Sequence, residues 1–158
     1  MRLYLVRHGQ AAEAFTDSQR SLTERGKREI RQMAEKLLRE KISPVKILHS
    51  PKLRARQSAE IFAEVLSGPS SLEVREFLNP DITIAPCLMA IGLMQAEQKG
   101  AAAILIGHLP HIRDLTAALL DPMPEAEDIQ FKTGTVACLE DDPQGTWKLI
   151  SVVSPAVP

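Results

Sequence analysis

Short apolar runs that alternate with amphipathic stretches constrain the fold of this chain most. Three such runs cover residues 3–6, 45–48 and 101–106, and each ends in polar residues. Their short length and mainly apolar character, continuous at residues 3–6, are typical of strands buried on both faces, as in a parallel sheet. Because helical patterns separate them, the sequence predicts an α/β fold. We expect a three-layer sandwich with a mostly parallel central sheet flanked by helices.

Four helices are expected between the strands. Apolar residues from Ile30 to Leu38 recur at helical spacing, and Ser21 or Thr23 is suited to cap the start of their helix. Ser50 as N-cap with Pro51 at the first position predicts a second helix that runs to about residue 66. The other predicted elements are helices near 86–99 and 110–120, strands near 72–75, 135–139 and 147–153, and an exposed loop at 121–128. They are expected to form one domain over residues 1–158.

Composition and charge exclude several classes of function. Nineteen Lys and Arg against 20 Asp and Glu give a net charge of -1, which argues against general nucleic-acid binding. No apolar run approaches the roughly 20 residues that span a bilayer, and the start of the chain does not resemble a signal peptide. Cys87 and Cys138 form no CxxC pair and are expected to be small buried hydrophobes. These features indicate a cytoplasmic protein that binds neither membranes nor nucleic acids.

Unusual polar residues follow three of the predicted strands. They are Arg7-His8-Gly9, His49-Ser50-Pro51 with Arg54, and Gly107-His108. Because parallel strands deliver their carboxyl ends to one edge of a sheet, His8, Arg54 and His108 are expected to meet there. Arginine matches phosphate oxygens with a fixed fork of donors, and neutral imidazole is a nucleophile. Each residue alone would more often be structural or solvated, but their convergence predicts a phosphate site.

Four ordered motifs resemble the histidine phosphatase superfamily, which has the phosphoglycerate mutase-like fold. Val6-Arg7-His8-Gly9 resembles its RHG signature, and matching pieces follow at 22–26, at 50–58 and at Gly107-His108. The short length of the chain and the sequence Gly107-His108-Leu109-Pro110 are most similar to those of the SixA-type phosphohistidine phosphatases. This resemblance covers nearly the whole chain.

The resemblance implies a role for each matching residue. His8 would be the phosphorylated nucleophile, Arg7 and Arg54 would bind phosphate, and His108 would be the second histidine of the pocket. Gly9 and Gln10 are expected to line the substrate site, with a position on the loop surface as the alternative for Gln10. Arg56 lies two positions beyond Arg54, where a helix points roughly the opposite way, so it is expected to be a solvated charge or a substrate contact.

Neither a metal nor a cofactor is expected. His111 follows His108 by three residues, a spacing compatible with a metal site, but the sequence offers no evident third ligand. His49 has no role in the resemblance and is expected on the rim of the site. The chemistry assigned to His8 and the two arginines requires no Lewis acid.

The sequence departs from the wider superfamily at the proton donor. Glu76 aligns with the expected acid only after a shift of one residue, so its role as a general acid stays open. An imidazole leaving group needs less help than an alkoxide, which favours phosphohistidine in a partner protein, such as a histidine-phosphotransfer domain. One alternative is a phosphatase or mutase that acts on a small phosphate ester. Another is an inactive phosphate-binding module, although Arg7, His8, Arg54 and His108 are all present.

Overall fold

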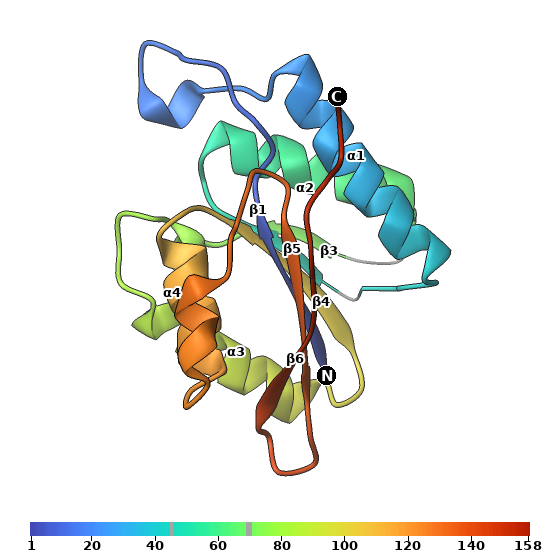
Figure 1. Ribbon diagram of the computed structural model, residues 1–158, viewed down its shortest axis with the longest axis vertical. Coiled ribbons are helices and arrows are strands. Elements are labelled where there is room, and N and C mark those ends of the chain that lie inside the picture. Colours follow the sequence, from blue (N-terminus) through green and yellow to red (C-terminus); the bar gives the residue numbers. More distant parts are fainter. Residues whose placement is uncertain (45, 69–70) are drawn as a thin grey trace.

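A six-stranded sheet forms the centre of the protein (Figure 1). The computed structural model describes residues 1–44, 46–68 and 71–158. Within them the strand order is β3-β2-β4-β1-β5-β6. The strands are β1 (Arg2–Arg7), β2 (Lys46–His49), β3 (Ser71–Val74), β4 (Ala102–Gly107), β5 (Val136–Asp141) and β6 (Trp147–Val153). The first four are parallel, whereas β5 is antiparallel to both β1 and β6, so the predicted mostly parallel sheet is confirmed. Val45, the predicted first residue of β2, lies outside the described residues.

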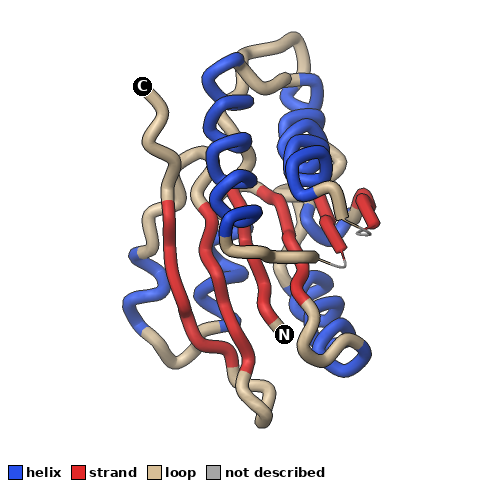
Figure 2. Tube along the Cα trace, turned by 90° about the vertical axis from the view of Figure 1, so that its right-hand side faces the viewer, coloured by secondary structure: helices blue, strands red, loops and turns tan. Residues whose placement is uncertain are grey.

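Helices cover both faces of this sheet. They are α1 (Glu24–Arg39), α2 (Leu53–Leu66), α3 (Ala85–Glu97) and α4 (His111–Leu119). The first two lie on one face and the last two on the other (Figures 1 and 2). Side chains of β1 alternate accordingly: Tyr4 and Val6 pack with α1 and α2, while Leu3 and Leu5 pack with α3 and α4. The predicted three-layer sandwich is therefore confirmed.

The start of α2 differs from the prediction. The helix begins at Leu53 with Lys52 as its N-cap, so the expected cap at Ser50 is wrong. Ahead of the helix, Oγ of Ser50 accepts the Lys52 N–H at 3.3 Å and lies 2.5 Å from Nε2 of His108. At the start of α1, Thr23 rather than Ser21 is the N-cap, because its Oγ1 accepts the Gly26 N–H at 3.0 Å.

Short 3₁₀ helices in the connections of the described chain are η1 (Asp17–Gln19), η2 (Glu76–Leu78) and η3 (Pro124–Asp128). The last corrects the expectation of an entirely exposed loop at 121–128. Ala126 is fully buried in the core on the α3 and α4 side, and this apolar contact explains why the segment folds onto the domain.

Both cysteines are buried and free, as expected. Burial raises the pKa of the Cys87 thiol to about 12 and also raises that of Cys138. Among the described residues, no helix combines the length and apolarity needed to cross a membrane.

Candidate active site

Three polar side chains from separate junctions meet at the carboxyl edge of the parallel strands. In the sheet, Arg7 pairs with Gly107 and His49 with Ile106, so the ends of β1, β2 and β4 are level. Nε of Arg54 lies 3.3 Å from Nε2 of His8, and the rings of His8 and His108 are 4.9 Å apart between centroids. All three side chains are buried. The predicted convergence is confirmed, while the catalytic roles of these residues stay predictions.

The surroundings of His8 prepare its imidazole to act as a nucleophile. Nδ1 lies 2.7 Å from the carbonyl oxygen of Gly9, which only accepts hydrogen bonds, so Nδ1 carries the proton. Nε2 is then left with a lone pair directed toward Arg54. Burial, together with the positive charges of Arg54 and Arg7, lowers the pKa of His8 to about 4, although the Gly9 carbonyl opposes this shift. His8 is therefore neutral at pH 7.

A carboxylate occupies the cationic side of the site. Nη1 of Arg54 donates to the Asp17 backbone oxygen at 2.8 Å, and Nη2 lies 3.3 Å from Asp17 Oδ2. Lys52, which is buried, donates to the same carboxylate at 2.7 Å. This hydrogen bond, and then the charge of Arg54, lowers the pKa of Asp17 to about 2 against the effect of burial. The side chains of Arg54 and Lys52 are therefore placed so that they bind an anionic oxygen directly.

Arg7 lies at the end of β1 with only part of its guanidinium engaged. Nη1 donates to the Phe131 backbone oxygen at 2.9 Å, while Nε is buried and has no hydrogen-bond partner among the described residues. Burial lowers the pKa of Arg7, and the carboxylate of Glu29 opposes that shift. Glu29 is itself buried and accepts hydrogen bonds from the Gln10 N–H at 2.8 Å and the Thr133 hydroxyl at 2.9 Å.

The structure gives Gly9 and Gln10 contacts with the start of α1. A Cβ on Gly9 would lie 2.6 Å from the Gly26 oxygen, and one on Gly26 would lie 2.0 Å from the Gln10 oxygen. Glycine at both positions therefore permits two backbone segments to touch. The Gln10 side chain accepts from the Thr23 hydroxyl at 2.8 Å. Substrate binding by Gly9 and Gln10 stays a prediction.

Three charged residues considered for the site, Glu76, Asp81 and Arg56, are exposed. Glu76 on η2 is exposed, and its carboxylate accepts from Nδ2 of Asn79 at 2.7 Å. Asp81 is closer to the cationic groups, with Oδ2 3.6 Å from Nζ of Lys52. Arg56 pairs with Glu60 at 2.8 Å on the outer face of α2, which agrees with a solvated charge.

The remaining histidines are buried. His49 is 6% exposed, so its expected position on the rim is wrong: its side chain is buried at the end of β2, with Nδ1 2.8 Å from the Ser50 carbonyl oxygen. His111 is also buried, and burial lowers its pKa. In residues 1–44, 46–68 and 71–158, no three His, Cys, Asp or Glu side chains are grouped so as to hold a metal ion.

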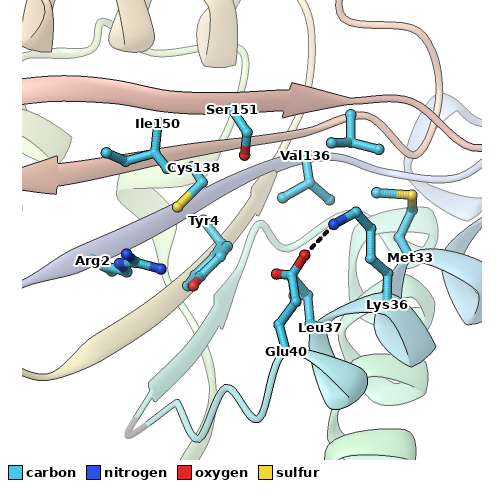
Figure 3. A pocket seen from close by; sticks show the side chains of 11 residues that line it. Arg2, Tyr4, Met33, Lys36, Leu37, Glu40, Val136, Cys138, Ile150 and Ser151 are labelled. Carbon is cyan, nitrogen blue, oxygen red and sulfur yellow. Dashed lines mark hydrogen bonds and ion pairs between the residues drawn. The ribbon is translucent and has the colours of Figure 1, made fainter.

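A separate hollow of about 290 Å³ lies between α1 and the sheet (Figure 3). Tyr4, which lines it, precedes His8 by four residues, a separation of about 13 Å along a strand. Its cations are paired, Arg2 with Glu140 at 2.9 Å and Lys36 with Glu40. The rest of its lining is largely apolar. The phosphate chemistry that the sequence predicts therefore fits the strand ends better than this hollow.

Comparison with known proteins finds relatives over nearly the whole chain. Residues 3–79 match the model of the histidine phosphatase superfamily (branch 1). The phosphohistidine phosphatase SixA of Escherichia coli (strain K12) is 36% identical over 147 residues, which are 92% of this chain and 88% of that protein. A structure of the protein histidine phosphatase SixA complexed with tungstate has a TM-score of 0.89 at 33% identity, and the match covers 98% of this chain and 97% of that one.

Proposed function

Because the chain belongs to the histidine phosphatase superfamily, we propose that it is a phosphatase that removes phosphoryl groups from phosphohistidine in a partner protein. Residues 1–158 would form its single catalytic domain. The observation that carries this proposal is the unprotonated Nε2 of His8, 3.3 Å from the guanidinium of Arg54. The 36% identity of this chain with a phosphohistidine phosphatase, over 92% of its length, supports phosphohistidine as the substrate class.

The proposed reaction has two steps. Nε2 of His8 attacks phosphorus, and the bond between phosphorus and the substrate imidazole breaks as the departing nitrogen takes a proton from solvent water. Water then attacks the phosphorylated His8, which releases inorganic phosphate and restores the neutral imidazole. Arg7 and Arg54 would balance the phosphoryl charge in both transition states, and His108 would donate a hydrogen bond. None of these steps requires a metal ion.

The placement of the carboxylates favours a leaving group that needs little protonation. The imidazolium of the substrate has a pKa near 6.5, whereas an alkoxide needs a positioned acid. Asp17 stays ionised because its pKa is about 2, and Glu76 is exposed and bonded to Asn79. The second candidate function, hydrolysis of small phosphate esters, would need an acid near the site, and Asp81, whose carboxylate lies 3.6 Å from Nζ of Lys52, is the candidate for it.

An exposed aromatic side chain beside the site favours a protein substrate. Phe15 is fully exposed, two residues before Asp17, which contacts Arg54 directly. Two residues of extended chain span at most about 7 Å, so the backbone of Phe15 lies within that distance of the Asp17 backbone. A small ester bound at His8 is too small to cover a side chain that faces solvent, whereas the surface of a partner protein extends far enough to cover it. We therefore propose that Phe15 contacts the protein substrate.

Turnover of a phosphohistidine protein should exceed that of small phosphomonoesters. We expect at least a ~10²-fold higher kcat/KM, equal to roughly 2.7 kcal/mol of differential transition-state binding. Glu76→Gln should change the rate on phosphohistidine by less than about twofold, since the leaving imidazole needs little acid. Steady-state kinetics with both substrates measures this. Equal or better turnover of glycerate or sugar phosphates, abolished by Glu76→Gln, would move the protein to the metabolite phosphatases.

Phe15→Ala should weaken binding of the protein substrate without impairing the chemistry. Burying a phenylalanine stabilises a complex by about 1.5–3 kcal/mol, so we expect KM to rise about tenfold while kcat is unchanged. Hydrolysis of a small phosphoramidate should keep its rate. Ile150→Ala, which removes an exposed apolar side chain on β6, is the control and should leave both substrates unaffected. An unchanged KM in Phe15→Ala would show that the partner does not touch this loop.

A further inference from the structure

Ser50 and His108 form a buried pair directly behind the proposed phosphate site. Oγ of Ser50 lies 2.5 Å from Nε2 of His108, and the two residues are 0% and 2% exposed. Oγ also accepts the backbone N–H of Lys52 at 3.3 Å. Since burial keeps solvent away, these contacts must account for the hydroxyl proton of Ser50.

The hydrogen-bond inventory of this pair decides which ring nitrogen of His108 carries the proton. The hydroxyl must donate, and among the described residues its one acceptor within reach is Nε2 of His108. If Nε2 were protonated instead, the hydroxyl proton would have no acceptor and the Nδ1 lone pair would also be left alone. If Nδ1 is protonated, a single buried donor remains unsatisfied, Nδ1–H, which has no partner in the described structure. The second arrangement leaves fewer unpaired polar groups.

A phosphoryl oxygen of the substrate can accept the hydrogen bond that Nδ1–H of His108 does not make within the described structure. The His108 ring lies 4.9 Å from that of His8, and its Nε2 is already turned to Ser50. Any bond from His108 to a phosphoryl group on His8 therefore comes from Nδ1. A protonated Nδ1 would donate to an anionic oxygen, whereas a lone pair there would repel it.

We propose that Ser50 is a positioning residue that holds neutral His108 in the Nδ1–H tautomer, so that this N–H binds the transferring phosphoryl group. The inference rests on the proposed function. His8 and His108 are then the same tautomer used in opposite ways. In His8, Nδ1–H donates to the Gly9 carbonyl, so the Nε2 lone pair is available for attack. In His108, Nε2 accepts from the Ser50 hydroxyl, so Nδ1–H is available to donate to the phosphoryl group.

Nitrogen NMR of ¹⁵N-histidine-labelled protein tests the tautomer directly. In the wild type at pH 7, His108 should show a protonated Nδ1 and an unprotonated Nε2, and added tungstate should shift the Nδ1–H resonance. Ser50→Ala should lose this preference, and Ser50→Thr, which keeps a hydroxyl, should retain it. A wild-type His108 protonated at Nε2 would overturn the proposal, and this measurement requires neither a variant nor an active enzyme.

Kinetics then connect the tautomer to catalysis. Ser50→Ala should lower kcat on a phosphohistidine protein at least ~10-fold with little change in KM, because the lost alignment affects mainly the transition state. Ser50→Thr should recover most of the rate. Thr116→Val is the matched control, because it removes a buried hydroxyl of α4 that donates to the Ile112 oxygen at 2.7 Å, and it should change neither kcat nor the His108 spectrum. A Ser50→Ala enzyme with full kcat would refute the role. An inactive wild type with the expected spectrum would refute the proposed function alone.

Discussion

His8→Ala should abolish hydrolysis of a phosphohistidine protein, with a loss of more than ~10³-fold in kcat. The expectation follows from geometry, because Nε2 of His8 is an unprotonated imidazole nitrogen facing the Arg54 guanidinium. Mass spectrometry of wild-type enzyme mixed with substrate under conditions that preserve phosphohistidine should find labile phosphate on the peptide that contains His8. The variant should show none.

Anion binding separates this outcome from simple misfolding. His8→Ala keeps Arg7, Lys52 and Arg54, so it should still bind tungstate or phosphate, which calorimetry measures. Full hydrolytic activity in the variant would refute the covalent mechanism. A wild type that binds tungstate but turns over no phosphohistidine or ester would instead identify an inactive phosphate-binding module.

The pH profile of the wild type provides a second check on the nucleophile. Protonation of Nε2 would remove the attacking lone pair, so activity is lost as pH falls through the pKa of His8. Burial places that pKa at about 4, below the ordinary value of 6.5. The titration of His8 should therefore make kcat/KM rise as the pH increases through about 4, and should contribute no change between pH 6 and 8. Titration of the His8 ring by NMR tests whether the rise in kcat/KM near pH 4 comes from this residue.

Much of the fold and the convergence at the site could be predicted because both follow from local patterns and one topological rule. Buried apolar runs fix the strands, and parallel strands bring their carboxyl ends to one edge. His8, Arg54 and His108 lie directly after such strands or in the first turn of the next helix, so strand order alone brings them together.

The polar contacts that organise the site could not be predicted in this way. Asp17 lies in a connection without periodicity, and only tertiary folding brings its carboxylate to Lys52 and Arg54. Glu29 lies among the charged positions of α1, yet the Gln10 N–H and the Thr133 hydroxyl draw it into the interior. The helix start expected at Ser50 is wrong because Pro51 and Lys52 precede the helix, and the contact of the Ser50 hydroxyl with His108 joins residues too far apart in sequence for a local pattern to predict.

Arg54→Ala should cost at least ~10²-fold in kcat on phosphohistidine, comparable with removal of one preorganised donor from an oxyanion site. Its guanidinium is buried, lies 3.3 Å from Nε2 of His8 and already holds a carboxylate in Asp17. A phosphoryl group on His8 would take the place of that carboxylate and gain charge-assisted hydrogen bonds. Arg54→Lys should recover only part of the rate, since a point charge lacks the planar fork.

Arg56→Ala is the matched control, because it removes the same side chain two residues later on the same helix. Arg56 is exposed and paired with Glu60, and an exposed pair of this kind is worth about 0.3–0.5 kcal/mol. We therefore expect kcat and KM to change by less than about twofold. Steady-state kinetics on both variants ranks the two arginines. A larger loss in Arg56→Ala than in Arg54→Ala would place the phosphate on the outer face of α2, away from His8, and would contradict the proposed site.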